Sequence, residues 1–234
     1  MSRKSKAVVT VVSSFANDAV LNKQGQVVSL RRGGPAYFVK NIFEQEKIKF
    51  DLVVGEEIDV EILVTESGEF GRVKTQIRNQ NLGDIKTECL LLSTIVNEWP
   101  FMLKKYSGIL FIDIQGFVRD PSDFGKKRMI SVPKRYRPFC VKGTEQEICY
   151  LPLDFIESQK ERCLIVTKGI MGSTIFYKRK EFTFKPRKIA RVLHTIGAGD
   201  TFFALFFAEF SRTHDVRVSG NYATEETILF LEGR

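Results

Sequence analysis

Histidine and cysteine are scarce in this chain of 234 residues, which has two histidines and four cysteines. Cys89, Cys140, Cys149 and Cys163 form no C-x-x-C pair. A structural zinc site needs closely spaced cysteine and histidine ligands, and a small disulfide-stabilised domain needs a dense cysteine framework. The sequence therefore predicts reduced thiols within the core, and neither a zinc site nor a disulfide framework.

Long apolar runs are also missing. No stretch of about 18 uninterrupted apolar residues occurs, as a membrane-spanning helix would need. The initial MSRKSK leads into a short strand-like run, which is not the pattern of a secretion signal. We therefore expect no membrane association and a cytoplasmic location. With 43% hydrophobic and 27% charged residues, residues 1–234 can bury the core of a single domain.

Positive charge is in excess, since 36 lysines and arginines face 28 acidic residues and give a net charge of +8. Such a balance favours phosphate-bearing ligands of every size. Much of the charge lies in two basic clusters, residues 126–137 and 178–191. Solvated loops and hairpin edges account for such clusters, because lysines hinder edge-to-edge strand pairing. Nucleic-acid contact is the alternative, but no recognised nucleic-acid motif accompanies the charge, so we do not expect that partner.

Short apolar runs alternate with helical patterns along the chain. Residues 88–96, 108–115 and 162–169 have the length and two-sided hydrophobicity of buried parallel strands. This order predicts an α/β fold of three layers around a mostly parallel sheet. Two alternating segments predict a small β excursion within residues 56–82. Residues 119–139 hold three of the seven prolines and no clear period, so we expect a long loop there.

The segment HTIGAGDTFFALFFAEF, residues 194–210, carries the clearest chemical signal. Gly197, Ala198 and Gly199 allow the backbone to approach a ligand and turn into an apolar helix, whose first amides are unpaired and attract an anion. Thr195 and Asp200 would flank that anion. A base next to a phosphate cradle is what phosphoryl transfer to a hydroxyl requires. A glycine-rich turn capped by an aspartate gives the same pattern and is the alternative.

Five patches in this order resemble the ribokinase-like (phosphofructokinase-B) sugar kinases. The late family signature D-T-x-G-A-G-D-x-F is similar to residues 194–202, and the early paired glycines stand at Gly33 and Gly34. Residues 167–172 have the form T-x-G-x-x-G. "GILFIDIQGFVR" resembles the family's D-x-N-x-R strand end, and "VKGTEQE" resembles its N-x-x-E motif. "GGPAY", "IDIQGFVR" and "VKGTEQE" look more like an archaeal-type branch that includes inositol kinases than like ribokinase.

The resemblance implies ATP-dependent phosphorylation of a hydroxyl of a sugar or cyclic polyol, with Mg²⁺ bridging the nucleotide phosphates. Asp200 would deprotonate the acceptor, and the amides of residues 197–199 would stabilise the transferring phosphoryl group. Asp18, with Gly33 and Gly34, would bind the polyol hydroxyls, because carboxylates accept hydrogen bonds from adjacent OH groups. As an alternative, Asp18 is an ordinary turn residue.

The remaining implied contacts concern the phosphoryl donor. Glu147 would reach Mg²⁺ through water, and five residues would contact the nucleotide: Lys142, Thr167, Gly169, Gly172 and Thr195. A solvated Lys142 is the alternative. The β excursion at residues 56–82 would be a lid that closes over substrate and excludes water, and in this family the lid often forms a homodimer interface.

The sequence departs from the family pattern at His194, Thr144 and Leu205, where the family has aspartate, asparagine and glycine. The first change puts activation by potassium in doubt. Together the changes permit a catalytically weak protein that senses a nucleotide or metabolite, and a nucleoside or vitamin-precursor kinase is the other alternative. The chain is shorter than usual for the family, so we expect a trimmed lid or trimmed final helices. Substrate specificity depends on loop geometry that one sequence does not fix.

Overall fold

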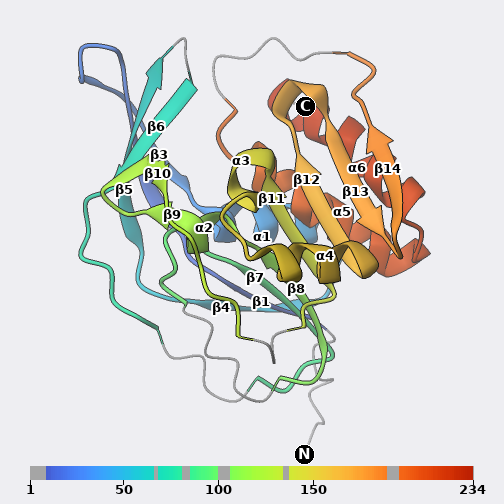
Figure 1. The fold of residues 1–234 in the computed structure, drawn as a ribbon. Helices are drawn as coiled ribbons and strands as arrows, with labels where there is room; N and C mark the ends of the chain where they lie inside the picture. Colours follow the sequence, from blue (N-terminus) through green and yellow to red (C-terminus); the bar gives the residue numbers. More distant parts are fainter. Residues whose placement is uncertain are drawn as a thin grey trace, which may run out of the picture.

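An eight-stranded sheet forms the centre of the molecule (Figure 1), with the strand order β14-β13-β12-β11-β8-β7-β1-β4. The computed structural model describes residues 9–65, 68–80, 85–99, 106–133, 137–188 and 195–233. Six adjacent strands are parallel, which confirms the mostly parallel α/β sheet. They are β1 (Val9–Ser13), β4 (Phe50–Val54), β7 (Cys89–Ser93), β8 (Ile109–Asp113), β11 (Cys140–Thr144) and β12 (Cys163–Thr167). At one edge, β13 (Ser173–Tyr177) and β14 (Lys180–Phe184) run antiparallel.

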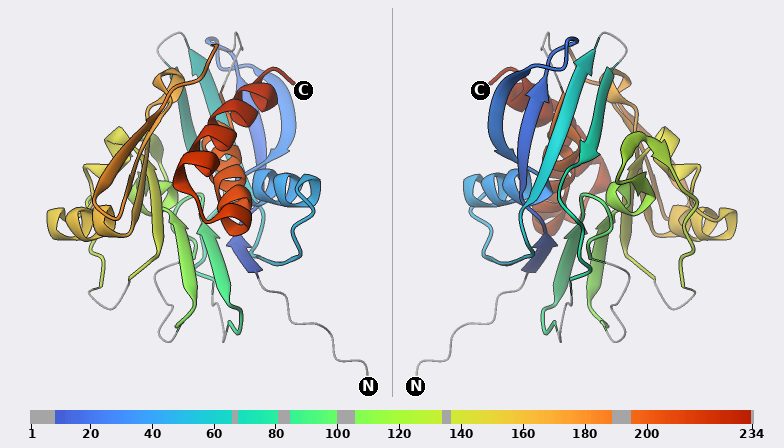
Figure 2. Two further views of the ribbon diagram at one scale, coloured as in Figure 1. Left: turned by 90° about the vertical axis from the view of Figure 1, so that its right-hand side faces the viewer. Right: turned by 90° about the vertical axis from the view of Figure 1, so that its left-hand side faces the viewer.

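Helices cover both faces of this sheet and complete three layers (Figure 2). On one face lie α1 (Pro35–Gln45), α5 (Ala198–Thr213) and α6 (Val216–Leu231). On the other face lie α3 (Glu145–Ile148) and α4 (Leu153–Glu161). None of the described helices is long and apolar enough to cross a membrane, and all four cysteines are free.

Helix α5 is buried over most of its length because residues 202–208 are all apolar. The ring of Phe207 stacks on Phe43 of α1 at 5.2 Å and meets Phe111 of β8 edge-on at 4.8 Å. Large aromatic side chains bury much apolar area and fix their neighbours in well-defined geometry. The middle of α5 is therefore held firmly between α1 and the central sheet.

A second, four-stranded sheet lies beside the first, in the order β3-β2-β5-β6. Its strands are β2 (Ala16–Leu21), β3 (Val27–Gly33), β5 (Ile58–Thr65) and β6 (Gly68–Val73). The β5–β6 pair is antiparallel and falls within residues 56–82, but the sheet also contains β2 and β3, which the sequence did not assign to the excursion. Its buried face packs on Ile95 and Val96, which follow β7.

The long loop expected at residues 119–139 is in part a hairpin, so that expectation was wrong there. After the short helix α2 (Gln115–Val118), strands β9 (Arg119–Asp120) and β10 (Asp123–Lys127) pair with each other. The hairpin also contacts the small sheet, since Val73 donates a backbone hydrogen bond of 2.8 Å to the carbonyl oxygen of Pro121. Strand β9 has only two residues, which is too short for an alternating pattern of apolar and polar residues. This hairpin therefore left no sign in the sequence.

Candidate active site

Polar side chains meet at the carboxyl ends of the central strands, where open α/β sheets bind their ligands. Ser93 and Asp113 are the last residues of β7 and β8 and are aligned with each other, and Lys142, in the middle of β11, is aligned with Asp113. The start of α5 faces them, because Ser93 Oγ donates a hydrogen bond of 3.4 Å to Asp200 Oδ1. The expected base therefore stands over the strand ends.

The turn before α5 depends on glycine. Gly197 has a φ of 83° in the left-handed region, and a Cβ on it would lie 2.2 Å from the ring of Phe38. The amide of Ala198 donates to the carbonyl oxygen of Thr195 at 3.0 Å, which closes the turn. Gly199 and Asp200 then occupy the first helical turn, whose amides have no acceptor within the helix. An anion at this point would also meet the positive end of the helix dipole.

Asp200 titrates close to neutrality. Burial and the negative charge of Asp113 raise the pKa of Asp200 to about 6, although the charges of Lys142 and Arg119 and the Ser93 hydrogen bond act in the opposite direction. A general base works best when its pKa lies near the operating pH. The environment of Asp200 is thus suited to taking a proton from a hydroxyl group.

Lys142 is not solvated, contrary to one of the two sequence interpretations. Its side chain is 1% exposed, and its Nζ lies 2.7 Å from Oδ2 of Asp113, which is also 1% exposed. A Cβ on Gly199 would lie 2.9 Å from the same Nζ, so the ammonium group is next to the start of α5. Burial alone would lower the pKa of Lys142, but the carboxylates of Asp113, Asp200 and Glu147 raise it, and the side chain stays charged.

Asp18 lies in a strand, so the turn interpretation was wrong. It is 3% exposed on β2 and pairs across the sheet with Arg31. A Cβ on Gly33 would lie 1.9 Å from Asp18 Oδ2, and Gly34 has a φ of 78°. Burial raises the pKa of Asp18 to about 6, against the charges of Arg31 and Arg119. The structure therefore brings Asp18 and the paired glycines together.

Arg119 connects the two acidic positions, since its charge acts on both Asp18 and Asp200. Its guanidinium lies 4.5 Å above the ring of Phe124 in the β9–β10 hairpin. Asp113 and Arg119 lie in the motif-like stretch GILFIDIQGFVR, but no role was predicted for either residue or for Ser93. A polar residue at the end of an apolar strand was the signal available for Ser93 and Asp113.

The expected donor side lies at the ends of β11 and β12. Thr167 is aligned with Thr144 and donates a hydrogen bond of 3.4 Å to the carbonyl oxygen of Gly143. Gly169, the first residue of the 3₁₀ turn η1 (Gly169–Met171), and Gly172, which follows the turn, both have a positive φ. The amide of Gly172 donates a hydrogen bond of 3.0 Å to the carbonyl oxygen of Gly169, and this bond closes the turn.

Glu147 forms a capping box with Thr144 at the start of α3. The amide of Thr144 donates to Glu147 Oε2 at 2.8 Å, and Thr144 Oγ1 accepts from the Glu147 amide at 3.2 Å. Among the described residues, no group of three or more histidine, cysteine or acidic side chains could hold a metal ion. Mg²⁺ needs no such group, because it commonly keeps several waters and uses one or two carboxylates with substrate phosphates. The residues present fit that mode of binding.

Of the departures from the family pattern at His194 and Leu205, the structure describes only the second. His194 lies outside the described residues. Leu205 is 2% exposed within the core formed by α5, so the leucine that stands in the place of a glycine fills space between packed layers.

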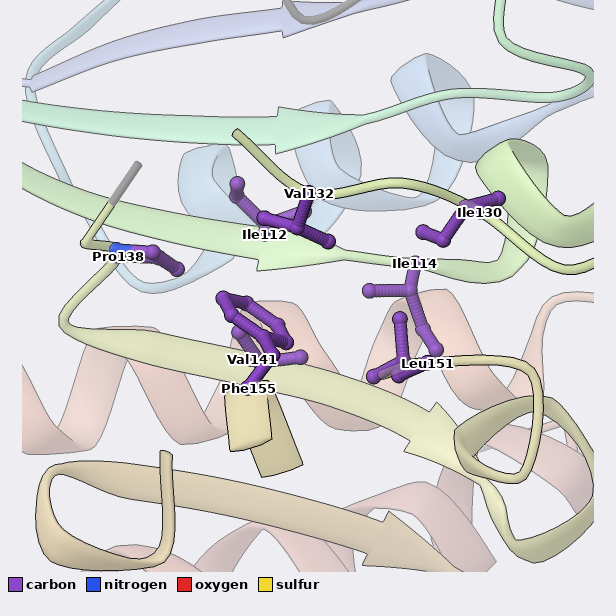
Figure 3. A pocket seen from close by; sticks show the side chains of 8 residues that line it. All are labelled: Ile112, Ile114, Ile130, Val132, Pro138, Val141, Leu151 and Phe155. Carbon is purple, nitrogen blue, oxygen red and sulfur yellow. The ribbon is translucent and has the colours of Figure 1, made fainter. Parts of the chain in front are cut away.

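A hollow on the α4 side of the sheet has no polar character (Figure 3). It is lined by apolar side chains only: Ile112, Ile114, Ile130, Val132, Pro138, Val141, Leu151 and Phe155. A polyol needs hydrogen-bonding partners for its hydroxyl groups. The candidate site is therefore the polar cluster around Asp200 and not this hollow.

Comparisons with known proteins relate the chain to carbohydrate kinases. Residues 149–225 match the family model described as pfkB family carbohydrate kinase, which supports the resemblance drawn from the motifs. An inositol 3-kinase from Arabidopsis thaliana is 24% identical over 236 residues; the match covers 83% of this chain and 65% of that relative's length.

Solved structures confirm the fold. A pyrophosphate-dependent kinase in the ribokinase family, complexed with a pyrophosphate analogue and myo-inositol, superposes with a TM-score of 0.72 at 16% identity, over 96% of this chain and 95% of that chain. The nucleoside kinase of Methanocaldococcus jannaschii, an archaeal member of the ribokinase family, superposes with a TM-score of 0.65 at 18% identity, over 96% and 91%.

Proposed function

We propose that this chain, whose residues 149–225 match the pfkB carbohydrate kinases, transfers a phosphoryl group to a hydroxyl of a sugar or cyclic polyol. The observation that carries the proposal is Asp200, a carboxylate with a pKa of about 6 in the first turn of a helix that begins with a glycine-rich turn. Phosphoryl transfer depends mainly on positioning and on stabilising charge, and the start of α5 offers both.

In the proposed reaction Asp200 accepts the proton of the attacking hydroxyl. The amides of the 197–199 turn and of the first turn of α5 stabilise the negative oxygens of the transferred group. Asp18 binds neighbouring hydroxyls of the acceptor and is held in place by its contact with Gly33. Mg²⁺, when bound through water at Glu147, would neutralise charge on the donor phosphates.

For the donor we propose ATP, bound near Thr167, Gly169, Gly172 and Thr195. The pyrophosphate-dependent relative makes pyrophosphate the alternative donor. For the acceptor we propose a cyclic polyol such as an inositol. The relative from Arabidopsis thaliana is named an inositol 3-kinase, and one structural neighbour is complexed with myo-inositol. A nucleoside is the alternative acceptor, given the similarity to a nucleoside kinase.

We further propose that residues 1–234 act as one kinase domain in the cytoplasm, with the small sheet as its lid and as a homodimer interface. The edge strand β3 supports the dimer, because it exposes three apolar side chains: Val27, Val28 and Leu30, the last of them 77% exposed. Light scattering would give twice the chain mass if this holds. A Leu30→Lys variant should then be monomeric.

The function is tested by assaying turnover with panels of inositols, pentoses, hexoses and nucleosides, each with ATP and with pyrophosphate. We expect turnover with a polyol and MgATP, and a loss of at least about 100-fold in kcat for Asp200→Asn, since a positioned general base contributes about 10²–10⁴-fold. The variant should keep its melting temperature and donor affinity. Binding without turnover for every pair would instead support a metabolite sensor.

A further inference from the structure

We propose that the buried ion pair of Lys142 and Asp113 is a positioning element of the phosphoryl-transfer site: it places the Lys142 ammonium group against Gly199 and so fixes the start of α5, which carries Asp200. The inference rests on the proposed kinase function. It gives Lys142 an indirect role, through the start of α5, in place of a direct contact with the nucleotide.

The pair is fixed by the sheet itself. Lys142 and Asp113 are aligned neighbours on β11 and β8, with 2.7 Å between Nζ and Oδ2. The second carboxylate oxygen, Oδ1, accepts a hydrogen bond of 3.0 Å from the amide of Gln115. Such a buried pair is a poor source of stability, because desolvation offsets the attraction between the charges. A role other than stability is therefore the better explanation of its presence.

The ammonium group touches the catalytic turn. A Cβ at position 199 would lie 2.9 Å from Lys142 Nζ, so the absence of a side chain on Gly199 lets the charge approach the backbone of α5. A positive charge below the first turn adds to the field that the helix dipole offers an anion. It also limits how far the turn can move toward the sheet.

Four groups from four different parts of the chain act on Asp200. Ser93 of β7, Arg119 after α2 and Lys142 of β11 lower the pKa of Asp200, whereas Asp113 of β8 raises it. The two members of the ion pair thus have opposite effects on one carboxylate. Removing Lys142 or Asp113 separately should therefore shift the titration of Asp200 in opposite directions, and the kcat of the neutral double variant separates positioning of α5 from this charge effect.

The experiment compares Lys142→Met, Asp113→Asn and the double variant with wild type. We expect the acid limb of kcat/KM against pH to move to higher pH in Lys142→Met and to lower pH in Asp113→Asn. The neutral double variant should regain most of the lost melting temperature but keep a kcat at least about tenfold below wild type, because misplacement by about 1 Å can cost 10²-fold. Lys142→Arg retains the charge and should keep the wild-type limb.

Two further measurements make the result decisive. Arg212→Met breaks the ion pair of Arg212 with Glu46 at the other end of α5, and should lower stability without moving the acid limb. The carboxyl titration of Asp200, followed by ¹³C NMR, tests the pair without any turnover. Absence of wild-type turnover contradicts the proposed function alone. Equal or absent shifts of the Asp200 titration in the two single variants, or a double variant with wild-type kcat, overturn the inference.

Discussion

Gly197→Ala should show how much the site depends on the turn before α5. At a φ of 83°, a non-glycine residue costs about 1–2 kcal/mol. The new Cβ would also lie 2.2 Å from the Phe38 ring, where ordinary contact begins at 3.4 Å, so the ring or the turn must move by more than about 1 Å. Overpacking of this kind adds about 1–3 kcal/mol. The total is about 2–5 kcal/mol, or roughly 4–20 °C in Tm for a chain of this size.

Gly25→Ala is the matched control. Gly25 has a φ of 76°, but nothing lies within 4 Å of an added Cβ, so only the backbone cost applies. Differential scanning calorimetry should show a larger loss for Gly197→Ala than for Gly25→Ala, and only the former should lose turnover, by about 10²-fold, because the first amides of α5 are displaced. Equal losses of Tm together with unchanged kcat in both variants would refute the reasoning.

Four other predictions follow from the titrations and contacts of the site. Because Asp200 must be ionised to act as a base and has a pKa of about 6, kcat/KM should fall about tenfold per pH unit below pH 6; a profile that stays flat to pH 5 would contradict this. Gly33→Ala should raise KM for the acceptor more than it lowers kcat, because the added methyl must displace the Asp18 carboxylate, and initial rates at varied acceptor concentration measure the split. The pKa of Asp18 rises from 3.8 to about 6 on folding, so the free energy of unfolding should decrease as pH rises through that window, and Asp18→Asn should flatten the dependence in urea titrations. Glu147→Gln keeps an oxygen that can accept from the Thr144 amide, so Tm should change little while the Mg²⁺ concentration for half-maximal rate increases; a large loss of Tm with unchanged Mg²⁺ dependence would assign Glu147 to the capping box alone.

Local patterns in the sequence were sufficient for the central elements. The apolar runs that became β7, β8 and β12 were recognisable because strands buried on both faces are apolar throughout. The start of α5 could be placed because the glycines and the run of phenylalanines lie within a single stretch of sequence. Each of these features depends on residues only a few positions apart.

Long-range pairing limited the rest of the prediction. Lys142 is one of 36 lysines and arginines, and its partner Asp113 is 29 positions away. The burial of both follows from the strand order, in which β11 lies next to β8, and sequence order does not contain that information. The β9–β10 hairpin escaped prediction for a related reason, since it is stabilised by β6 from the other sheet.

Arg119 connects the carboxyl groups of Asp18 and Asp200 to the small sheet. Its guanidinium rests on the Phe124 ring, a contact of the cation–π kind, and the same ring packs so closely on β6 that a Cβ on Gly71 would lie 2.5 Å from it. Through its charge, Arg119 stabilises the ionised forms of both Asp18 and Asp200. A shift of β6 would therefore move Phe124, and with it the positive charge that acts on both Asp18 and Asp200. In the proposed kinase, closure of the small sheet over a substrate would thus be linked through one arginine to the ionisation of Asp200.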